Sequence, residues 1–422
     1  MTTIPTPGQL RWQEIAYGMF CHFGINTFYG KEWSDGSLPS SGFDPRRLDA
    51  RQWVETAKAA GMRYLIFTAK HHDGFCLWPT STTDYALTSS PYKGGKGDIV
   101  GNLATACRDA GMEFGLYLSP WDRHEPRYPN AEEYDRFYVQ QLTELCTRYG
   151  PLFEIWFDGA GSTGRTYNWD AIMETVDRYQ PNAMVFNMGR PTIRWIGNED
   201  GLAADPNMYV VSQLLGSSAY SEARLAAGPQ YVPPECDVSI RTGWFWHPQE
   251  EHTIKSVEHL LGIYYRSIGL GANLLLNVPP NRDGLIANED RARLLEMTAE
   301  LERRFAHPIA GRIEQEGATV RVTFDAPAEF DHLVLCERLA EGQHVNGYTV
   351  ALEPAGREIA RGITIGAKRI HAFPAVRGQS LQITLSTPDA HLSSVTAHRT
   401  GHGELPMLGK PLKPGDLAAR VD

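Results

Sequence analysis

Short apolar runs alternate with longer amphipathic segments through the first three quarters of the chain. Runs such as RYLIFTA at 63–69 and EFGLYLS at 113–119 are each followed by a segment whose apolar residues recur every three or four positions, which is the spacing of one helix face. Near-continuous apolar strands separated by such helices indicate a parallel sheet covered by helices. Seven such units in about 290 residues favour a (β/α)8-like, TIM-type barrel over an open sheet.

The predicted elements of this barrel follow from the same pattern. Several predicted helices end on a glycine just beyond the last apolar position, as a helix C-cap requires. The predicted strands are 16–24, 63–69, 113–119, 152–158, 183–188, 235–240 and 272–278, and the predicted helices are 45–61, 97–111, 131–150, 168–181, 253–269 and 288–305.

The pattern changes after about residue 310, where strand-like stretches recur and no helical segment of comparable length separates them. Alternating stretches of this kind predict an all-β sandwich. We therefore expect two units, a catalytic (β/α)8-like barrel at 1–308 and a C-terminal β-sandwich at 309–422. The strand-like stretches are 318–324, 331–339, 347–353, 368–375, 379–386 and 393–399.

Charge and cysteine usage narrow the function. Lys and Arg number 40 against 50 Asp and Glu, a net charge of −10, so neither nucleic acid nor an anionic membrane is an expected partner. The six cysteines form no CxxC pair, which argues against a zinc ribbon or a dithiol site. The first residues lack the pattern of a signal peptide. We expect a cytoplasmic protein, or an exported one whose leader has been removed.

In a barrel of this type the active site lies at the carboxyl ends of the strands. Spacings of 45, 41 and 41 residues separate His72, Tyr117, Asp158 and Glu199, so each step covers about one βα unit and equivalent positions face one site. The polar or aromatic residues predicted at strand ends are His22, His71, His72, Asp73, Tyr117, Trp156, Asp158, Glu199, Glu235 and Trp244.

Carboxylates at these strand ends are candidates for glycoside hydrolysis, which needs two of them. Asp158 closes the run FEIWF and precedes Gly159, so it is a candidate nucleophile, although a loop-capping role fits the same position. Glu199, in the turn GNEDG, is the candidate acid/base. Glu235 follows two prolines and is the alternative acid/base. We expect hydrogen-bond donors such as the nearby histidines to keep Asp158 ionised, and apolar or anionic surroundings to raise the pKa of Glu199.

The histidines allow two interpretations. His22, His71 and His72 with Asp73 could ligate a metal, or the imidazoles could bind sugar hydroxyls. Metalloprotease spacing is absent, as are GxGxxG, a P-loop and GxSxG. We therefore expect no metal and no cofactor.

Five motifs follow one another along the chain: CHFGINTFYGKEW, AKHHDGFCLW, GLYLSPWDRHE, EIWFDGAG and NLLLNVPPNRDGLI. In order along the chain they resemble the α-L-fucosidases of glycoside hydrolase family 29, and HLVLCERLAEGQHVNGYTV at 332–350 resembles that family's β-sandwich. RWIGNEDG at 194–201 and PPECDVSIRTGWFWHP at 233–248 resemble the subfamily that acts on α-1,3/1,4-linked fucose in branched, Lewis-type glycans.

The resemblance implies a retaining exo-α-L-fucosidase acting on a fucosylated oligosaccharide or glycoconjugate. It implies that Asp158 is the nucleophile and Glu199 the acid/base, with the carboxyl groups about 5–5.5 Å apart. It also implies a fucose pocket lined by His22, Glu32, Trp33, His71, His72, Tyr117, Trp156 and Trp244. Three alternatives stay open from the residues alone: another barrel glycosidase such as an α-galactosidase, a non-catalytic carbohydrate-binding protein, and a metal-dependent hydrolase.

Overall fold

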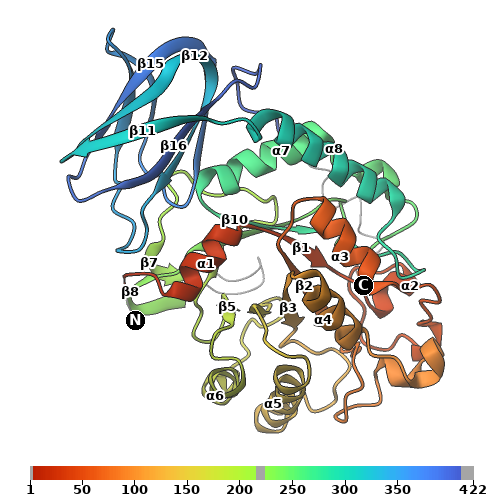
Figure 1. Ribbon diagram of the computed structural model, residues 1–422. Coiled ribbons are helices and arrows are strands. Elements are labelled where there is room, and N and C mark those ends of the chain that lie inside the picture. The colour runs from red at the N-terminus through yellow and green to blue at the C-terminus, as the bar shows by residue number, and fades with distance from the viewer. Residues whose placement is uncertain (1–2, 215–223, 410–422) are drawn as a thin grey trace.

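The computed structural model describes residues 3–214 and 224–409. Its larger sheet has eight parallel strands in the order β5-β4-β3-β2-β1-β10-β9-β6 (Figure 1). A parallel bridge between Phe186 and Ile193 joins the two ends of this order, so the sheet nearly closes. The strands are β1 (Tyr17–Cys21), β2 (Tyr64–Lys70), β3 (Glu113–Leu118), β4 (Glu154–Trp156), β5 (Met184–Phe186), β6 (Arg194–Trp195), β9 (Pro234–Ser239) and β10 (Asn273–Asn277).

The predicted barrel is confirmed, with one difference after β5. All six predicted helices are present, but β6 and the antiparallel hairpin of β7 (Val210–Leu214) and β8 (Arg224–Tyr231) lie between the predicted strands 183–188 and 235–240, where no element was predicted. Among the described residues no helix is long and apolar enough to cross a bilayer. The helices are α1 (Pro7–Ile15), α2 (Ile25–Tyr29), α3 (Ala50–Ala59), α4 (Ile99–Ala110), α5 (Ala131–Arg148), α6 (Trp169–Tyr179), α7 (Val257–Arg266) and α8 (Asn288–Phe305).

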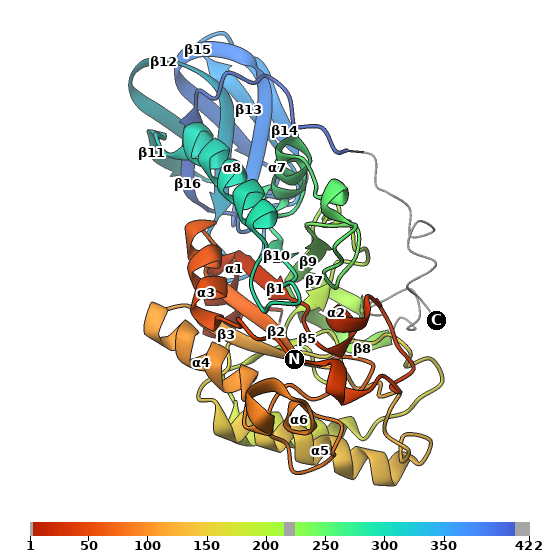
Figure 2. The same ribbon diagram turned by 90° about the vertical axis from the view of Figure 1, so that its right-hand side faces the viewer.

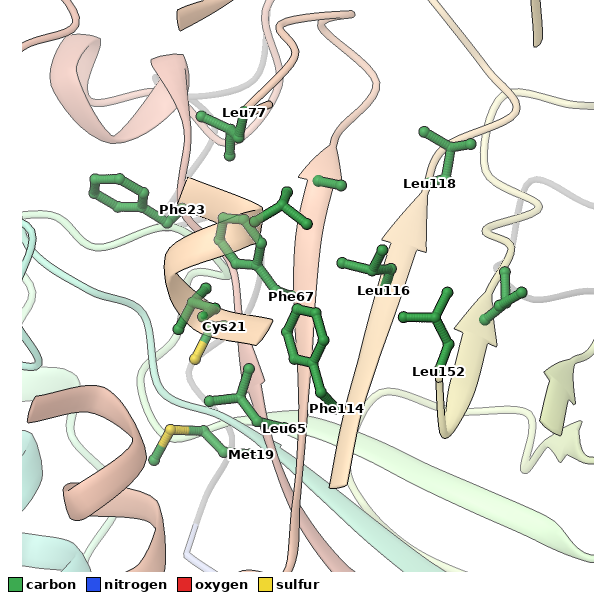
Figure 3. Close-up of a cluster of buried hydrophobic side chains, with 14 of the residues drawn as sticks. Met19, Cys21, Phe23, Leu65, Phe67, Leu77, Phe114, Leu116, Leu118 and Leu152 are labelled. Atoms are coloured by element: carbon green, nitrogen blue, oxygen red, sulfur yellow. The ribbon is translucent and has the colours of Figure 1, made fainter. Parts of the chain in front are cut away.

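Side chains of the barrel strands alternate between two cores, because successive residues of a strand point to opposite faces. One set faces the helices, and Figure 3 shows neighbouring members of it from β1, β2 and β3, including Met19, Leu65 and Leu116. The other set fills the barrel interior and includes Phe20, Tyr64, Tyr117, Trp156 and Leu275. The second set determines which residue each strand presents at its carboxyl end.

A β-bulge interrupts this alternation at the end of β2. Thr68 pairs with Tyr117, but Lys70 pairs with Leu118, so β2 contains one extra residue there. Lys70 consequently points toward α5, where its Nζ lies 2.9 Å from Asp122 Oδ2 and 2.9 Å from Gln141 Oε1. The residues that follow Lys70 are thereby turned toward the barrel axis.

The C-terminal strands form the predicted sandwich. They pair as an antiparallel sheet in the order β11-β16-β12-β15-β13-β14, and β11 also pairs with β12. Two of the predicted stretches merge in β12 and two in β15, because these long strands continue through register shifts. The division into 1–308 and 309–422 stays a prediction. The strands are β11 (Ile309–Glu316), β12 (Thr319–Glu337), β13 (Tyr348–Glu353), β14 (Arg357–Gly362), β15 (Arg369–Leu385) and β16 (Leu392–His398).

Helices α7 and α8 lie between the barrel and the sandwich (Figures 1 and 2). Arg304 of α8 donates to the hydroxyl of Tyr265 at 3.2 Å, and that oxygen lies 3.0 Å from His332 Nε2 of β12. His332 Nδ1 is in turn 2.8 Å from Asp331 Oδ1. This hydrogen-bonded chain ties both helices to the sandwich.

A buried ion pair fixes the loop after β9 to the start of α8. Arg241 Nε lies 3.0 Å from Asp290 Oδ1, and neither side chain is exposed. Replacing Asp290 by Ala leaves the guanidinium buried beside only the partly exposed Glu289, and we expect the free energy of unfolding to fall by about 3–5 kcal/mol. Urea unfolding followed by tryptophan fluorescence measures this change.

The control for that experiment is Asp177→Ala, which removes an exposed ion pair with Arg190. Exposed pairs contribute little, so we expect a change of less than about 1 kcal/mol. Equal losses in the two variants would contradict a special role for the buried pair.

Candidate active site

Polar residues end the inward-facing rows of the barrel strands. His22 follows Phe20 by two positions, Ser119 follows Tyr117, and Asp158 follows Trp156, so each points toward the barrel axis as its predecessor does. The same two-residue step ends β10 on Asn277. The fold thus collects these side chains at the carboxyl ends of the strands, where His22 and Asp158 were predicted to lie.

Asp158 lies at the centre of this group and keeps 15% of its side-chain surface exposed. The hydroxyl of Tyr117 donates to Oδ2 at 2.9 Å, and the backbone N–H of Ala160 donates to Oδ1 at 2.8 Å. Burial raises the pKa of Asp158 to about 6, and these two hydrogen bonds oppose the rise. The carboxylate is therefore ionised above that pH.

Three imidazoles surround this carboxylate. The ring centroids of His71 and His72 are 4.1 Å apart, and those of His22 and His71 are 5.6 Å apart. Burial lowers the pKa of both His22 and His72 to about 3, and it lowers the pKa of His71 well below its ordinary value. The rings are therefore neutral.

The expectation that histidines donate to Asp158 is not met. His72 Nε2 is 3.5 Å from Asp158 Oδ2, and Tyr117 and Ala160 supply the hydrogen bonds instead.

Glu199 lies beyond β6 and is exposed to solvent. Its pKa rises to about 7, first because the surrounding protein displaces part of its water and then because of the negative charge of Asp158. A hydrogen bond from the Trp244 side chain opposes the rise. This rise in the pKa of Glu199 is in the direction that the sequence predicted. Because the charge of Asp158 contributes to the rise, the two carboxyl groups lie in the same site.

Glu32 does not present a free carboxylate to a ligand. Its Oε2 accepts the backbone N–H of Trp244 at 2.8 Å, and its Oε1 accepts that of Phe245 at 3.2 Å. Glu32 therefore holds the segment that carries the Trp244 ring, whose centroid is 5.0 Å from that of His22. Trp33 lies nearby, with its ring 5.5 Å from His72.

Trp156 and Glu235 lie beneath the site. The Trp156 ring stacks on Tyr117 at 5.4 Å, and its Nε1–H donates to Glu235 Oε2 at 3.0 Å. Tyr64 donates to the other oxygen of Glu235 at 2.7 Å, and the residue is completely buried. Glu235 is thus placed inside the barrel, below the aromatic layer and away from the strand ends.

Glu235 shares this interior with a second carboxyl group, Glu154. Trp12 donates to Glu154 Oε2 at 2.9 Å. The other oxygen, Oε1, is buried, and it contacts the carboxyl group of Glu235. Burial raises the pKa of both groups, and the charge of Glu235 raises that of Glu154 further. Because Glu235 accepts two hydrogen bonds, we place the shared proton on Glu154.

Sequence reasoning missed four residues that shape the site, namely Ser119, Glu154, Asp237 and Asn277. Asp237 is buried and accepts a hydrogen bond from the Nε1–H of Trp195 at 2.7 Å. Trp195 lies four positions before Glu199 in the sequence. The signal was available in the two-residue step of the strands, since Glu235 and Asp237 share one face of β9. No comparable signal revealed the partners of Ser119 and Asn277.

Within residues 3–214 and 224–409, no three His, Cys, Asp or Glu side chains are grouped so that they could hold a metal ion. A cavity of about 450 Å³ lies at the amino ends of β1 and β10, between α1 and the sandwich, with Leu10, Ala16, Arg338 and Lys368 among its lining. It contains none of the strand-end residues, and active sites of such barrels form at the opposite ends of the strands.

Comparison with known proteins identifies the family. Residues 37–304 match the family model described as Alpha-L-fucosidase. A protein of Oryza sativa subsp. japonica that bears the alpha-L-fucosidase name is 38% identical and is aligned over 90% of this chain and 82% of its own length. The chain belongs to the alpha-L-fucosidase family. It is therefore a glycoside hydrolase, and the family implies a fucosylated glycan as substrate.

Solved structures agree with this assignment to the fucosidases. A glycoside hydrolase 29 family member from an unknown rumen bacterium has a TM-score of 0.86 and 33% identity, covering 97% of this chain and 78% of the other. The Ruminococcus gnavus GH29 fucosidase solved with fucose has a TM-score of 0.84 and 29% identity, covering 94% and 95%. The likeness therefore includes both the barrel and the sandwich.

Replacing Tyr117 by Phe tests the electrostatics at Asp158 of this fucosidase. The phenol hydrogen bond favours the ionised carboxylate, so its loss is expected to raise the pKa of Asp158 by about one unit. Titration of the labelled Asp158 carboxyl carbon by ¹³C NMR, assigned with Asp158→Asn, measures the shift. An unchanged or lowered pKa would contradict the hydrogen-bond assignment.

Proposed function

We propose that this fucosidase is a retaining exo-enzyme that releases terminal α-1,3/1,4-linked L-fucose from branched, Lewis-type oligosaccharides. The observation that carries the proposal is the pair of carboxyl groups at the strand ends, Asp158 and Glu199, held in different environments among histidines and tryptophans. Two carboxyl groups with opposite protonation are what retaining hydrolysis requires.

Asp158 is the proposed nucleophile. It accepts hydrogen bonds from Tyr117 and Ala160 on different oxygens, which orient the carboxylate toward one position. Its pKa of about 6 lies below that of Glu199, at about 7. Between these values Asp158 is the ionised member of the pair and Glu199 the protonated one.

Glu199 is the proposed acid/base. In the first step protonated Glu199 donates its proton to the glycosidic oxygen while Asp158 attacks the anomeric carbon, which forms a covalent fucosyl-enzyme and frees the aglycone. Glu199 is then ionised and takes a proton from water, whose oxygen displaces Asp158 and releases fucose with its configuration retained. Solvent exposure of Glu199 leaves room for both the aglycone and this water.

Glu235 is the alternative acid/base, and its surroundings disfavour that role. Both of its oxygens accept hydrogen bonds from side chains of the barrel interior, and no part of the residue is exposed. A proton donor must come within hydrogen-bond reach of the glycosidic oxygen, and the Trp156 ring stands between Glu235 and the strand ends. We therefore assign Glu235 to holding Trp156.

The remaining pocket residues would bind the sugar. His22, His71 and His72 offer neutral ring nitrogens to hydroxyl groups, and the rings of Trp33 and Trp244 offer partly exposed apolar faces suited to a sugar face or to the C6 methyl. Tyr117 and Trp156 support the floor. The similar Ruminococcus gnavus fucosidase was solved with fucose, which supports fucose as the sugar that this pocket would bind.

The catalytic roles are tested with three variants on an aryl α-L-fucoside. We expect Asp158→Ala to lower kcat by about 10³-fold or more. Azide should restore the rate of Glu199→Ala, because a small nucleophile replaces the water that Glu199 activates. Glu235→Gln serves as the comparison, and azide should not rescue it.

Two outcomes would overturn these roles. Azide rescue of Glu235→Gln together with full activity of Glu199→Ala would move the acid/base role to Glu235. NMR of the first-formed sugar is expected to show α-fucose, and initial β-fucose would establish inversion.

The linkage proposal rests on the likeness of residues 194–201 and 233–248 to the α-1,3/1,4-specific subfamily. We expect kcat/KM on Lewis a or Lewis x oligosaccharides to exceed that on an α-1,2-linked fucoside by at least about tenfold, the range that a few subsite contacts provide. Fucose release measured side by side on both substrates decides this. Equal rates would remove the linkage assignment and leave the fucosidase assignment in place.

A further inference from the structure

In two imidazoles of the site, those of His22 and His72, the Nδ1 atom contacts another side chain of the protein. The Nε2 atom of each ring faces the site. A neutral imidazole carries one proton, on either nitrogen, and the hydrogen-bond partner of one nitrogen decides the role of the other. The partners of both rings are Ser119 and Asn277, residues to which neither the motifs nor the mechanism above gave a role. The other contacts of Ser119 and Asn277 fix the directions of their hydrogen bonds to the two rings.

The direction at His72 follows from the Ser119 hydroxyl. Ser119 Oγ lies 2.7 Å from the carbonyl oxygen of Trp121 and 2.7 Å from His72 Nδ1. A carbonyl oxygen can only accept, so the single hydroxyl hydrogen goes to Trp121. Ser119 Oγ must then accept from His72, which places the ring proton on Nδ1.

The direction at His22 follows from the Asn277 amide. Its Nδ2 lies 2.9 Å from the carbonyl oxygen of Trp244 and 2.9 Å from Ser239 Oγ, whose own hydrogen goes to the Gly243 carbonyl at 2.7 Å. Nδ2 is therefore the donor end of the amide. Oδ1 accepts the backbone N–H of His22 at 3.1 Å and faces its Nδ1 at 3.0 Å, so Nδ1 of His22 also carries the proton.

Both Nε2 atoms are consequently lone-pair acceptors. His72 Nε2 faces the carboxylate oxygen Oδ2 of Asp158 at 3.5 Å, which is likewise an acceptor. His22 Nε2 contacts no hydrogen-bond partner among the described residues. Burial of both rings, which disfavours the imidazolium form, leaves these atoms in need of external donors.

We propose that Ser119 and Asn277 are positioning residues that fix His72 and His22 as Nδ1–H tautomers, so that the site offers two imidazole acceptors which two sugar hydroxyl groups satisfy as donors. The proposal rests on the proposed function in that it places the sugar against Asp158. It predicts strong rejection of sugars that lack either hydroxyl, because a buried acceptor is then left unpaired.

The tautomers are measured directly on the free enzyme by ¹⁵N NMR of histidine-labelled protein. His22→Gln and His72→Gln assign the two rings. We expect a protonated Nδ1 and a bare Nε2 on both, and a mixture of tautomers at His72 in Ser119→Ala and at His22 in Asn277→Ala. An Nε2–H tautomer on either ring of the wild-type enzyme would overturn the proposal without reference to any substrate.

Kinetics on deoxy analogues then tests the role in recognition. For Ser119→Ala, we expect kcat/KM on the aryl α-L-fucoside to fall about tenfold, the cost of one misdirected buried hydrogen bond. The 2-, 3- and 4-deoxy fucosides are then compared, and one of them lacks the hydroxyl that faces His72. On that analogue, kcat/KM of the variant and of the wild type should differ by less than about twofold. A merely structural role for Ser119 would lower all four rates by the same factor, and that result would overturn the proposal.

The control is Ser90→Ala. Ser90 is also buried, and its hydroxyl donates to the Leu87 carbonyl at 2.6 Å, remote from the strand ends. We expect its four rates to match those of the wild type. If the wild-type enzyme cleaves none of the fucosides, the proposed function fails, while the NMR result still decides the tautomers.

Discussion

The two-residue step of side chains along the barrel strands is the constraint on which the site depends. A residue that follows an interior aromatic by two positions has to face the same axis, so Phe20 determines where His22 points and Trp156 determines where Asp158 points. Parallel strands bring these positions to one end of the barrel. Chain segments that are distant in sequence therefore supply one small group of polar side chains.

The barrel interior below the site is itself polar in places. Two indoles and a phenol, from Trp12, Trp156 and Tyr64, donate to the carboxyl groups of Glu154 and Glu235. Large rings fill the space that the closed sheet leaves, and their N–H and O–H groups need acceptors once buried. The acidic pair satisfies them, so the same side chains provide both the volume and the hydrogen bonds that hold the floor of the pocket.

The fold was predictable where periodicity is strong. The seven barrel strands found from the sequence stand out as apolar runs and the six helices by their period, whereas β6 has two residues and shows neither. Asp158 was placed at its strand end because an uninterrupted apolar run precedes it. The supporting role of Glu32 was not predictable, because its partners are backbone N–H groups of Trp244 and Phe245, more than 200 positions away, and backbone groups leave no trace in a sequence.

The bulge at the end of β2 has a consequence for how this barrel could change. One extra residue separates an orientation in which Lys70 lies among Asp122, Gln141 and the rings of α5 from one in which it would face the barrel axis. In a regular strand of the same sequence, without the bulge, Lys70 and His71 would exchange surroundings, which would place an ammonium group beside Asp158 and an imidazole against α5. The pocket is thus constrained by this bulge as well as by its residues, since straightening the strand would invert the chemistry of the pocket while every side chain of the motif is still present.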